Sequence, residues 1–418
     1  MLKKILISAI LIPTFLIPSA DVSAKEKTVK SIIIDALNES LAQPYEKDAM
    51  FYEQRAIDYA KEKNWALAEE NYSKAIANFE KAMEINPSDE GYPRLLCDSY
   101  IGRAESYFHQ KKYNLAIEDC AKAISIEPND KYVYSLRGMS YWKQEICDLA
   151  IKDFDQCLRI DPNDVSKLND LANLYEQRAQ DYEYQEKWDL VIENYSYAIV
   201  NFSKAIGLEP NDKYYPRFLS HAYLNRGIAY NKSEKYDLAI ADYNQAINLN
   251  DDTNSAYYWR GQAYTTQGKY DLAIEDFNKI IELDPDNHFS YEHRADAYKK
   301  LEEWNRAIED YYRAIELLRK EIELNLDEDV NSVFLFGDYI SCGDLYASQE
   351  IYDQAIENYS QSLGVNTIEA LYFDAYLKRA EMYEKIGEIS HAITDYQKAL
   401  DISPDNEIAR NNLNRLQG

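Results

Sequence analysis

The sequence predicts an all-α protein, an α-solenoid of nine helix-turn-helix units, and two observations lead to this fold class. A short motif recurs nine times along the 418 residues, with tyrosines at fixed distances from a small residue. A second pattern of small and aromatic residues follows each occurrence, and most units then close on proline. A fixed period of this length indicates a stack of helical repeats, in which each unit buries its apolar face against its neighbours.

The first motif marks the first helix of each unit. A small residue follows Arg in eight units and Cys342 in the other, and tyrosine stands four residues before and three residues after it in all nine. These offsets lie on one face of an α-helix, and the small residue lets a neighbouring helix approach. The small residues are Ala56, Ala104, Gly138, Ala179, Gly227, Gly261, Ala295, Gly343 and Ala380.

The second pattern marks the second helix of each unit. Twelve residues after the small residue comes Ala in eight units and Val191 in the other, and four residues later Tyr or Phe, with Cys120 as the exception. Proline then prevents the helix from continuing. The closing prolines are Pro87, Pro128, Pro162, Pro210, Pro285 and Pro404.

Together these positions resemble the tetratricopeptide repeat, a helix-turn-helix unit of 34 residues. The resemblance covers about residues 49 to 404 and implies a right-handed α-solenoid with a concave groove for peptides or proteins. Three of the eight intervals between small residues are 34 residues, and the others are 48, 41, 48, 48 and 37. Seven residues make nearly two helical turns and leave a buried stripe in phase, so we expect lengthened helices rather than loops.

Four segments are expected along the chain. Residues 1–24 are predicted to be a signal peptide, with Lys3 and Lys4, an apolar run and a small-residue site before Ala24, and an uncleaved anchor is the alternative. The apolar run is shorter than the roughly 20 residues that span a bilayer. Residues 25–48 are expected to form an N-terminal capping helix, residues 49–404 the solenoid, and residues 405–418 a C-terminal capping helix. The chain is therefore expected to be exported, to the periplasm or the exterior.

The chain is strongly acidic, with a formal net charge of −27 at pH 7. Such a field repels phosphate groups, which disfavours nucleic acids and anionic membranes as partners and favours basic ones. Solubility alone is the alternative explanation of the charge.

No residue pattern predicts catalysis, a cofactor or a metal site. The five histidines do not share helical faces, the cysteines form no CxxC pair, and the glycines form no phosphate-binding loop. Cys120, Cys147 and Cys157 are interpreted as buried small hydrophobic residues. The repeated Arg residues are expected to form structural ion pairs with acids of the following helix, such as Glu118 and Glu275.

A candidate partner surface follows from the family resemblance. The positions three before, one after and four after each small residue, named here the groove positions, should line the concave side. In the N-terminal repeats they are largely apolar, and the candidate binding residues are Ile57, Ile101, Glu105, Phe108, Met139 and Trp142. Large aromatic residues beside acids suit a peptide or helix with apolar and basic side chains. The alternative is that Phe108 and Trp142 pack between adjacent repeats.

The predicted function is a non-enzymatic scaffold that binds protein or peptide partners in this groove. Two other functions remain open from the sequence: an accessory subunit of a separately encoded envelope enzyme or sensor, and an enzyme in its own right.

Overall fold

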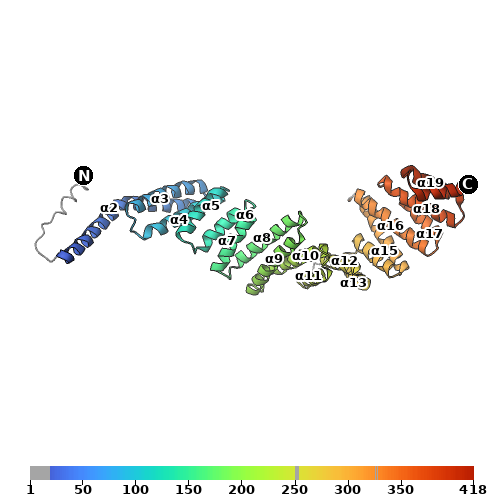
Figure 1. Ribbon diagram of the computed structural model, residues 1–418, viewed down its shortest axis with the longest axis horizontal. Helices are drawn as coiled ribbons and strands as arrows, with labels where there is room; N and C mark the ends of the chain where they lie inside the picture. The colour runs from blue at the N-terminus through green and yellow to red at the C-terminus, as the bar shows by residue number, and fades with distance from the viewer. Residues whose placement is uncertain (1–18, 250–253, 325, 327) are drawn as a thin grey trace. The chain divides into compact units, whose positions relative to one another are not determined.

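The helices follow one another along the chain in pairs (Figure 1). The computed structural model describes residues 19–249, 254–324, 326 and 328–418, and its contacts divide the chain into two units, residues 1–178 and 179–418. Residues 1–18 of the predicted signal peptide lie outside the described residues, and of residues 19–24 only the helical backbone is described. Each unit is described below by itself.

Nine helix pairs occupy the described residues, in which no strand occurs. The first helices of the pairs are α2 (Ser19–Lys61), α4 (Gly91–His109), α6 (Lys131–Trp142), α8 (Val165–Glu183), α10 (Tyr214–Lys232), α12 (Asn254–Thr266), α14 (His288–Lys300), α16 (Glu328–Ser348) and α18 (Tyr372–Lys385). The second helices are α3 (Trp65–Ile85), α5 (Tyr113–Ile126), α7 (Cys147–Ile160), α9 (Trp188–Leu208), α11 (Tyr236–Leu249), α13 (Tyr270–Leu283), α15 (Trp304–Glu323), α17 (Tyr352–Ser362) and α19 (Ile389–Ile402). A short 3-10 turn, η1 (Glu369–Leu371), precedes α18, and α20 (Glu407–Gln417) follows the last pair. The predicted all-α fold is confirmed.

The buried stripe of each second helix packs against the small residue of its own first helix. All nine residues of the Ala or Val row are buried, and so are the aromatic residues four positions later. A Cβ atom added to Gly138 would lie 2.7 Å from the ring of Phe154, and one added to Gly343 would lie 2.4 Å from the ring of Tyr359. The small residue is therefore required by close helix packing, as predicted.

The extra residues of the long repeats lengthen helices on both sides of a repeat junction. The second helices α3 and α9 have 21 residues, whereas α5, α7, α11, α13 and α19 have 14. The following first helices α4 and α10 have 19 residues, against 12 in α6 and 13 in α12. The predicted helix extension is present. Half of each 14-residue insertion lengthens the second helix of one repeat, and the other half lengthens the first helix of the following repeat. Both helices must lengthen together because they pack against each other.

Every turn between the two helices of a pair contains one residue in the left-handed backbone region. Seven of these nine positions hold Lys or Glu, with φ near 60°, and only Gly268 and Gly387 are glycines. Each lies seven residues after the small residue of its repeat. This conformation ends the first helix and reverses the chain in the same way in all nine repeats.

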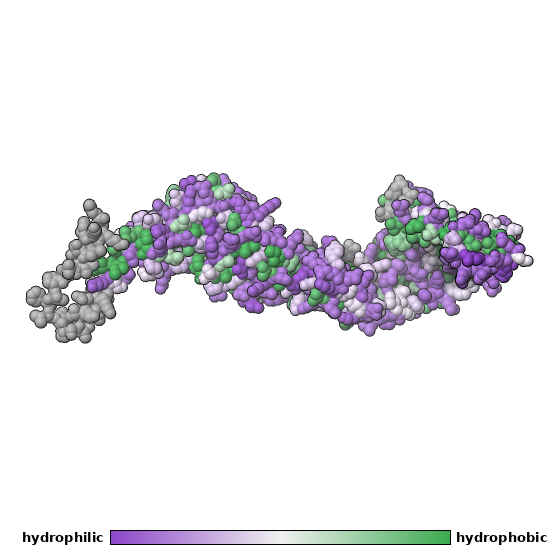
Figure 2. Space-filling model, turned by 45° about the horizontal axis from the view of Figure 1, so that its top comes forward, coloured by the Kyte–Doolittle hydropathy of each residue, from purple (hydrophilic) through white to green (hydrophobic). Residues whose placement is uncertain are grey.

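The N-terminal end differs from the expected separate capping helix, whereas the C-terminal end has a helix of its own, α20. At the N-terminal side, residues 25–48 continue into the first helix of the first repeat as one helix, α2, which contains Pro44. Its early part exposes Ile32 and Ile34, and Figure 2 shows hydrophobic surface there, next to the grey residues. At the C-terminal side, α20 buries Leu413 against the last pair and leaves Ile408 exposed.

Candidate protein-binding groove

A buried ion pair ties the two helices of most repeats together. In six repeats the Arg before the small residue donates two hydrogen bonds to an Asp sixteen residues later, as in Arg103 with Asp119, at 2.6 and 2.9 Å. The same pairing occurs at Arg137, Arg226, Arg260, Arg294 and Arg379. These Asp residues are 2 to 5% exposed, so the pairs are structural and do not form a ladder of free cations for an acidic ligand.

The predicted partners of the Arg row were the wrong acids. Glu118 and Glu275 are exposed, and the carboxylates that bind Arg103 and Arg260 belong to the next residues, Asp119 and Asp276. A shift of one residue rotates a side chain by about 100° around the helix, which separates the buried stripe from the solvent face. Sequence spacing alone did not resolve this rotation.

The tyrosine stripe flanks the Arg row. The guanidinium of Arg103 lies 5.7 Å from the ring centroid of Tyr100 and 5.8 Å from that of Tyr107, and Arg226 and Arg379 make the same pair of contacts. These cation–π contacts join side chains of one helix and hold the guanidinium in place. The ion pair with Asp119 then fixes the first helix on the second, and with it the groove positions of that repeat.

The six predicted binding residues are all half-buried in the N-terminal unit. Ile101 and Phe108 pack at the edge of one buried cluster, whereas Ile57 packs at the edge of another, around Ala56 and Tyr72. The charge of Glu105 raises the pKa of Tyr132, after the larger effect of burial, to about 12. Their assignment as a binding site stays a prediction.

Trp142 makes contacts of the kind that the packing alternative predicts. Its indole N–H donates a hydrogen bond of 2.8 Å to Oε1 of Gln177, on the first helix of the next repeat. Its ring meets that of Phe154 edge to face, with centroids 6.3 Å apart. The interaction spans adjacent repeats and leaves part of the ring accessible.

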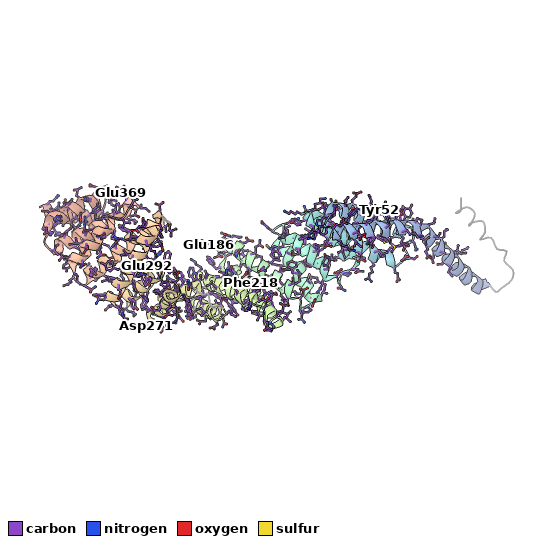
Figure 3. The ribbon with its side chains drawn as sticks, turned by 180° about the vertical axis from the view of Figure 1, so that it is seen from behind. Tyr52, Glu186, Phe218, Asp271, Glu292 and Glu369 are labelled. Atoms are coloured by element: carbon purple, nitrogen blue, oxygen red, sulfur yellow. The ribbon has the colours of Figure 1, made fainter. Side chains whose placement is uncertain are left out.

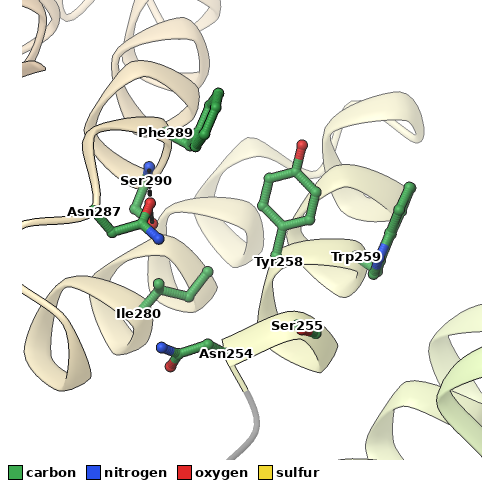
Figure 4. Close-up of a pocket in the computed structure, with 8 residues that line it drawn as sticks. All are labelled: Asn254, Ser255, Tyr258, Trp259, Ile280, Asn287, Phe289 and Ser290. Atoms are coloured by element: carbon green, nitrogen blue, oxygen red, sulfur yellow. Dashed lines mark hydrogen bonds between the residues drawn. The ribbon is translucent and has the colours of Figure 1, made fainter. Parts of the chain in front are cut away.

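A second pair of aromatic residues at the C-terminal unit lines a pocket that the sequence analysis missed. Tyr258 of α12, Phe289 of α14 and Ile280 of α13 line it, and Ile280 lies below the two rings in the view of Figure 4. The Tyr258 hydroxyl lies 3.1 Å from Nε2 of His293. Tyr258 occupies a groove position, three residues before Gly261, so the spacing rule contained the signal, but Phe289 lies outside that rule.

Three carboxyl groups on α14 and α16 lie close enough to affect one another's pKa values. Glu292 and Asp296 occupy groove positions of α14, and Asp338 lies on α16; these three residues are named here the acidic trio. Glu292 is labelled in Figure 3. Burial, followed by the charge of Asp296, raises the pKa of Glu292 to about 7, and burial followed by the charges of Glu292 and Asp296 raises that of Asp338 well above its usual range.

Among the described residues, neither the cysteines nor the possible metal ligands form a further site. No cluster of three or more His, Cys, Asp or Glu residues suited to a metal ion occurs in the described ranges. All five cysteines are buried and unbridged, as the interpretation of Cys120, Cys147 and Cys157 as small hydrophobic residues requires. No described helix is both long and apolar enough for a bilayer crossing.

Family models match the chain at several of these helix pairs. One model of the tetratricopeptide repeat matches residues 97–130 and 255–287. A second model of this repeat matches residues 66–89, 132–164 and 373–406, and a TPR repeat model matches residues 227–268. The chain contains tetratricopeptide repeats. Some matched segments cover a helix pair, for example α12 with α13, whereas residues 66–89 cover α3 alone and residues 227–268 run from within α10 to the end of α12.

Solved structures similar to this tetratricopeptide repeat protein were also found, whereas the search of curated proteins gave no match. The MamA protein shares 25% identity over 46% of this chain and 94% of its own, with a TM-score of 0.34. YrrB, described as a TPR protein with an unusual peptide-binding site, shares 21% identity over 50% of this chain and 96% of its own, with a TM-score of 0.38. The C-terminal part of a TPR repeat-containing protein from Cytophaga hutchinsonii shares 20% identity over 74% of this chain and 98% of its own, with a TM-score of 0.37.

Proposed function

We propose that this tetratricopeptide repeat protein is a non-enzymatic scaffold that binds peptide or protein partners along its groove positions. The observation that carries the proposal is the contrast between the two helices of a repeat. The stripes of the second helices are fully buried, whereas large side chains at the groove positions, such as Phe108, Trp142 and Tyr258, keep accessible surface. Accessible aromatic side chains on a rigid framework are typical of binding sites.

The framework supports binding because it costs little reorganisation. Buried ion pairs fix the first helices on the second helices, so a partner meets side chains that are already in place. The net charge of −27 adds attraction for basic segments and speeds their encounter.

Replacing Phe108 and Trp142 together with Ala tests the N-terminal part of the groove. A partner recovered by the immobilised full chain from an envelope extract, then purified, should lose about 2 kcal/mol or more of binding energy. The melting temperature should change little if these rings serve binding. A large fall in melting temperature with undiminished binding would show that they belong to the packing between repeats.

We also propose that the protein is exported after removal of residues 1–24. The basic start, the apolar run and the small residues before Ala24 support this proposal. The intact mass of the envelope fraction should correspond to a chain that begins at Lys25. Full-length protein in the cytosol would contradict export.

A further inference from the structure

Asp338 occupies a position that other repeats fill with small or apolar residues. Five residues before the small residue, the first helices of repeats two to nine all carry a buried side chain. The residues at this position are Ser99, Val133, Leu174, Ala222, Ala256, Ser290, Asp338 and Ala375. A carboxyl group at such a site is costly unless it has a partner, so its presence requires an explanation.

The carboxyl group of Asp338 faces other carboxyl groups. Asp338 is 2% exposed. Neither Oδ2 of Asp338 nor Oε2 of Glu292 has a hydrogen-bond partner. Asp296 accepts a hydrogen bond of 2.6 Å from the hydroxyl of Tyr311. No Lys or Arg in the described part of the chain forms an ion pair with any member of the acidic trio.

In the next repeat, a lysine neutralises the Asp residue that is equivalent to Asp296. Asp344 occupies the position equivalent to Asp296, and the hydroxyl of Tyr359 donates to it at 2.7 Å, as Tyr311 does to Asp296. Asp344 is also neutralised by Lys378, whose Nζ lies 2.7 Å from Oδ2. Lys378 stands two residues before the small residue Ala380, and the equivalent residue next to Asp296 is Ser341. The cation that completes the site around Asp344 is thus replaced by a neutral side chain.

We propose that the acidic trio binds the ammonium or guanidinium group of a Lys or Arg side chain from a bound peptide, in the place that Lys378 takes beside Asp344. The inference rests on the proposed scaffold function and specifies the partner's chemistry. Glu292 and Asp296 are half-buried and form the accessible rim of the site, and Asp338 forms its floor.

An apolar residue of the same peptide enters the neighbouring pocket between Tyr258 and Phe289. Phe289 and Glu292 are three residues apart on α14, so their side chains share a helix face. The charge of Glu292 also contributes to the raised pKa of Tyr258, which places the pocket wall close to the trio. Together the pocket and the trio recognise an apolar residue near a basic one.

Binding of labelled heptapeptide pools to the full chain tests the proposal. The central residue is Lys, Arg, norleucine or Glu, and the flanking positions are mixtures of Ala, Leu and Phe. The Lys and Arg pools should bind at least tenfold more tightly than the norleucine pool at pH 8. This preference should shrink at pH 5.5, because protonation of the trio competes with the cation.

Substitutions test whether the acidic trio, rather than the overall negative charge of the chain, causes the preference for Lys and Arg. Glu292→Gln and Asp338→Ala should reduce the preference for Lys and Arg to less than threefold, and Ser341→Lys should do the same by supplying an internal cation. Asp353→Asn removes an exposed carboxylate from α17 and should leave the preference unchanged. Ser341→Lys should also raise the melting temperature at pH 8.

The outcomes distinguish this inference from the scaffold function. Equal binding of the basic and norleucine pools would overturn the inference and leave the scaffold function standing. Binding of no pool would also overturn the inference, whereas the scaffold function is tested separately by the partner that the immobilised full chain recovers. A preference that survives in Glu292→Gln and Asp338→Ala would also overturn the inference, because the cation would then be recognised elsewhere.

Discussion

Lys and Glu side chains in left-handed turns show how much the repeat geometry requires of single residues. An L-residue in this region carries roughly 1–2 kcal/mol of steric cost, which glycine avoids. Seven of the nine turns carry this cost and the identical geometry persists, so packing of the two helices determines the turn.

Replacing Glu302 with Gly should therefore stabilise the protein. The φ of Glu302 is 59°, and relief of the strain should exceed the added entropy of the unfolded chain by about 0.5 kcal/mol. Glu303, with a φ of −82°, is the matched control, and Glu303→Gly should destabilise or have no effect. Urea unfolding of the three proteins measures the differences, and equal effects of the two substitutions would contradict the argument.

The Arg–Asp pair gives a second prediction at this scale. Asp119→Asn removes the counter-charge of Arg103, whose side chain is 15% exposed, and should cost about 2–4 kcal/mol of unfolding free energy. Glu118→Gln, at the exposed neighbouring residue, should change it by less than about 0.5 kcal/mol. Similar losses in both variants, measured by chemical denaturation, would refute the assignment of Asp119 as the buried partner.

Packing between first helices operates at the scale of the element. The helices α14 and α16 carry Glu292, Asp296 and Asp338, and at the position of Asp338 the other repeats from the second onwards have small or apolar side chains. Tyr258 of α12 and Tyr311 of α15 also face these carboxyl groups, and His293 of α14 lies beside Tyr258. Burial lowers the pKa of His293, so no positive charge from this histidine neutralises the junction near pH 7.

Stability of this junction should depend on pH. The folded-state pKa of Glu292, about 7, lies above its ordinary value of 4.5, so folding favours the protonated form. The resulting stability is fully present below about pH 4.5 and is lost as the pH rises towards 7, because the unfolded chain then releases the proton that the buried carboxyl group of the folded chain retains.

Thermal unfolding of the ligand-free protein at several pH values between 5 and 8 tests this dependence. The melting transition that reports on the C-terminal unit should fall with rising pH, and Glu292→Gln should flatten the curve. The exposed-residue variant Asp353→Asn controls for net charge. If Glu292→Gln and the unsubstituted protein fall in parallel, the carboxyl group of Glu292 is not the cause.

For the whole molecule, each repeat is stabilised mainly by its neighbours. Buried clusters form within a pair and between consecutive pairs, such as the cluster of α14, α15 and α16. Stability is then a sum of repeat and junction contributions, without a single central core.

Removal of the N-terminal repeats should accordingly leave the remainder folded. A chain of residues 171–418 keeps α9 to α20 complete and should remain helical by circular dichroism, with a lower melting temperature. Loss of all helical signal would instead indicate one cooperative domain.

The sequence by itself determined the class of the fold, the number of repeats and the lengthened helices. Tyrosines, small residues and alanines recur at helical offsets because the two helices pack in the same way in every repeat. Only the tertiary structure decided which acid pairs with Arg103, that residues 25–48 continue into the first repeat, and that Asp338 meets Glu292 across a junction. Helix rotation and inter-repeat contacts settle these points, and both arise from side chains far apart in the chain. The candidate site was accordingly predictable in part: the groove rule contained Tyr258, Glu292 and Asp296, whereas Phe289 and Asp338 join the site through packing between consecutive first helices.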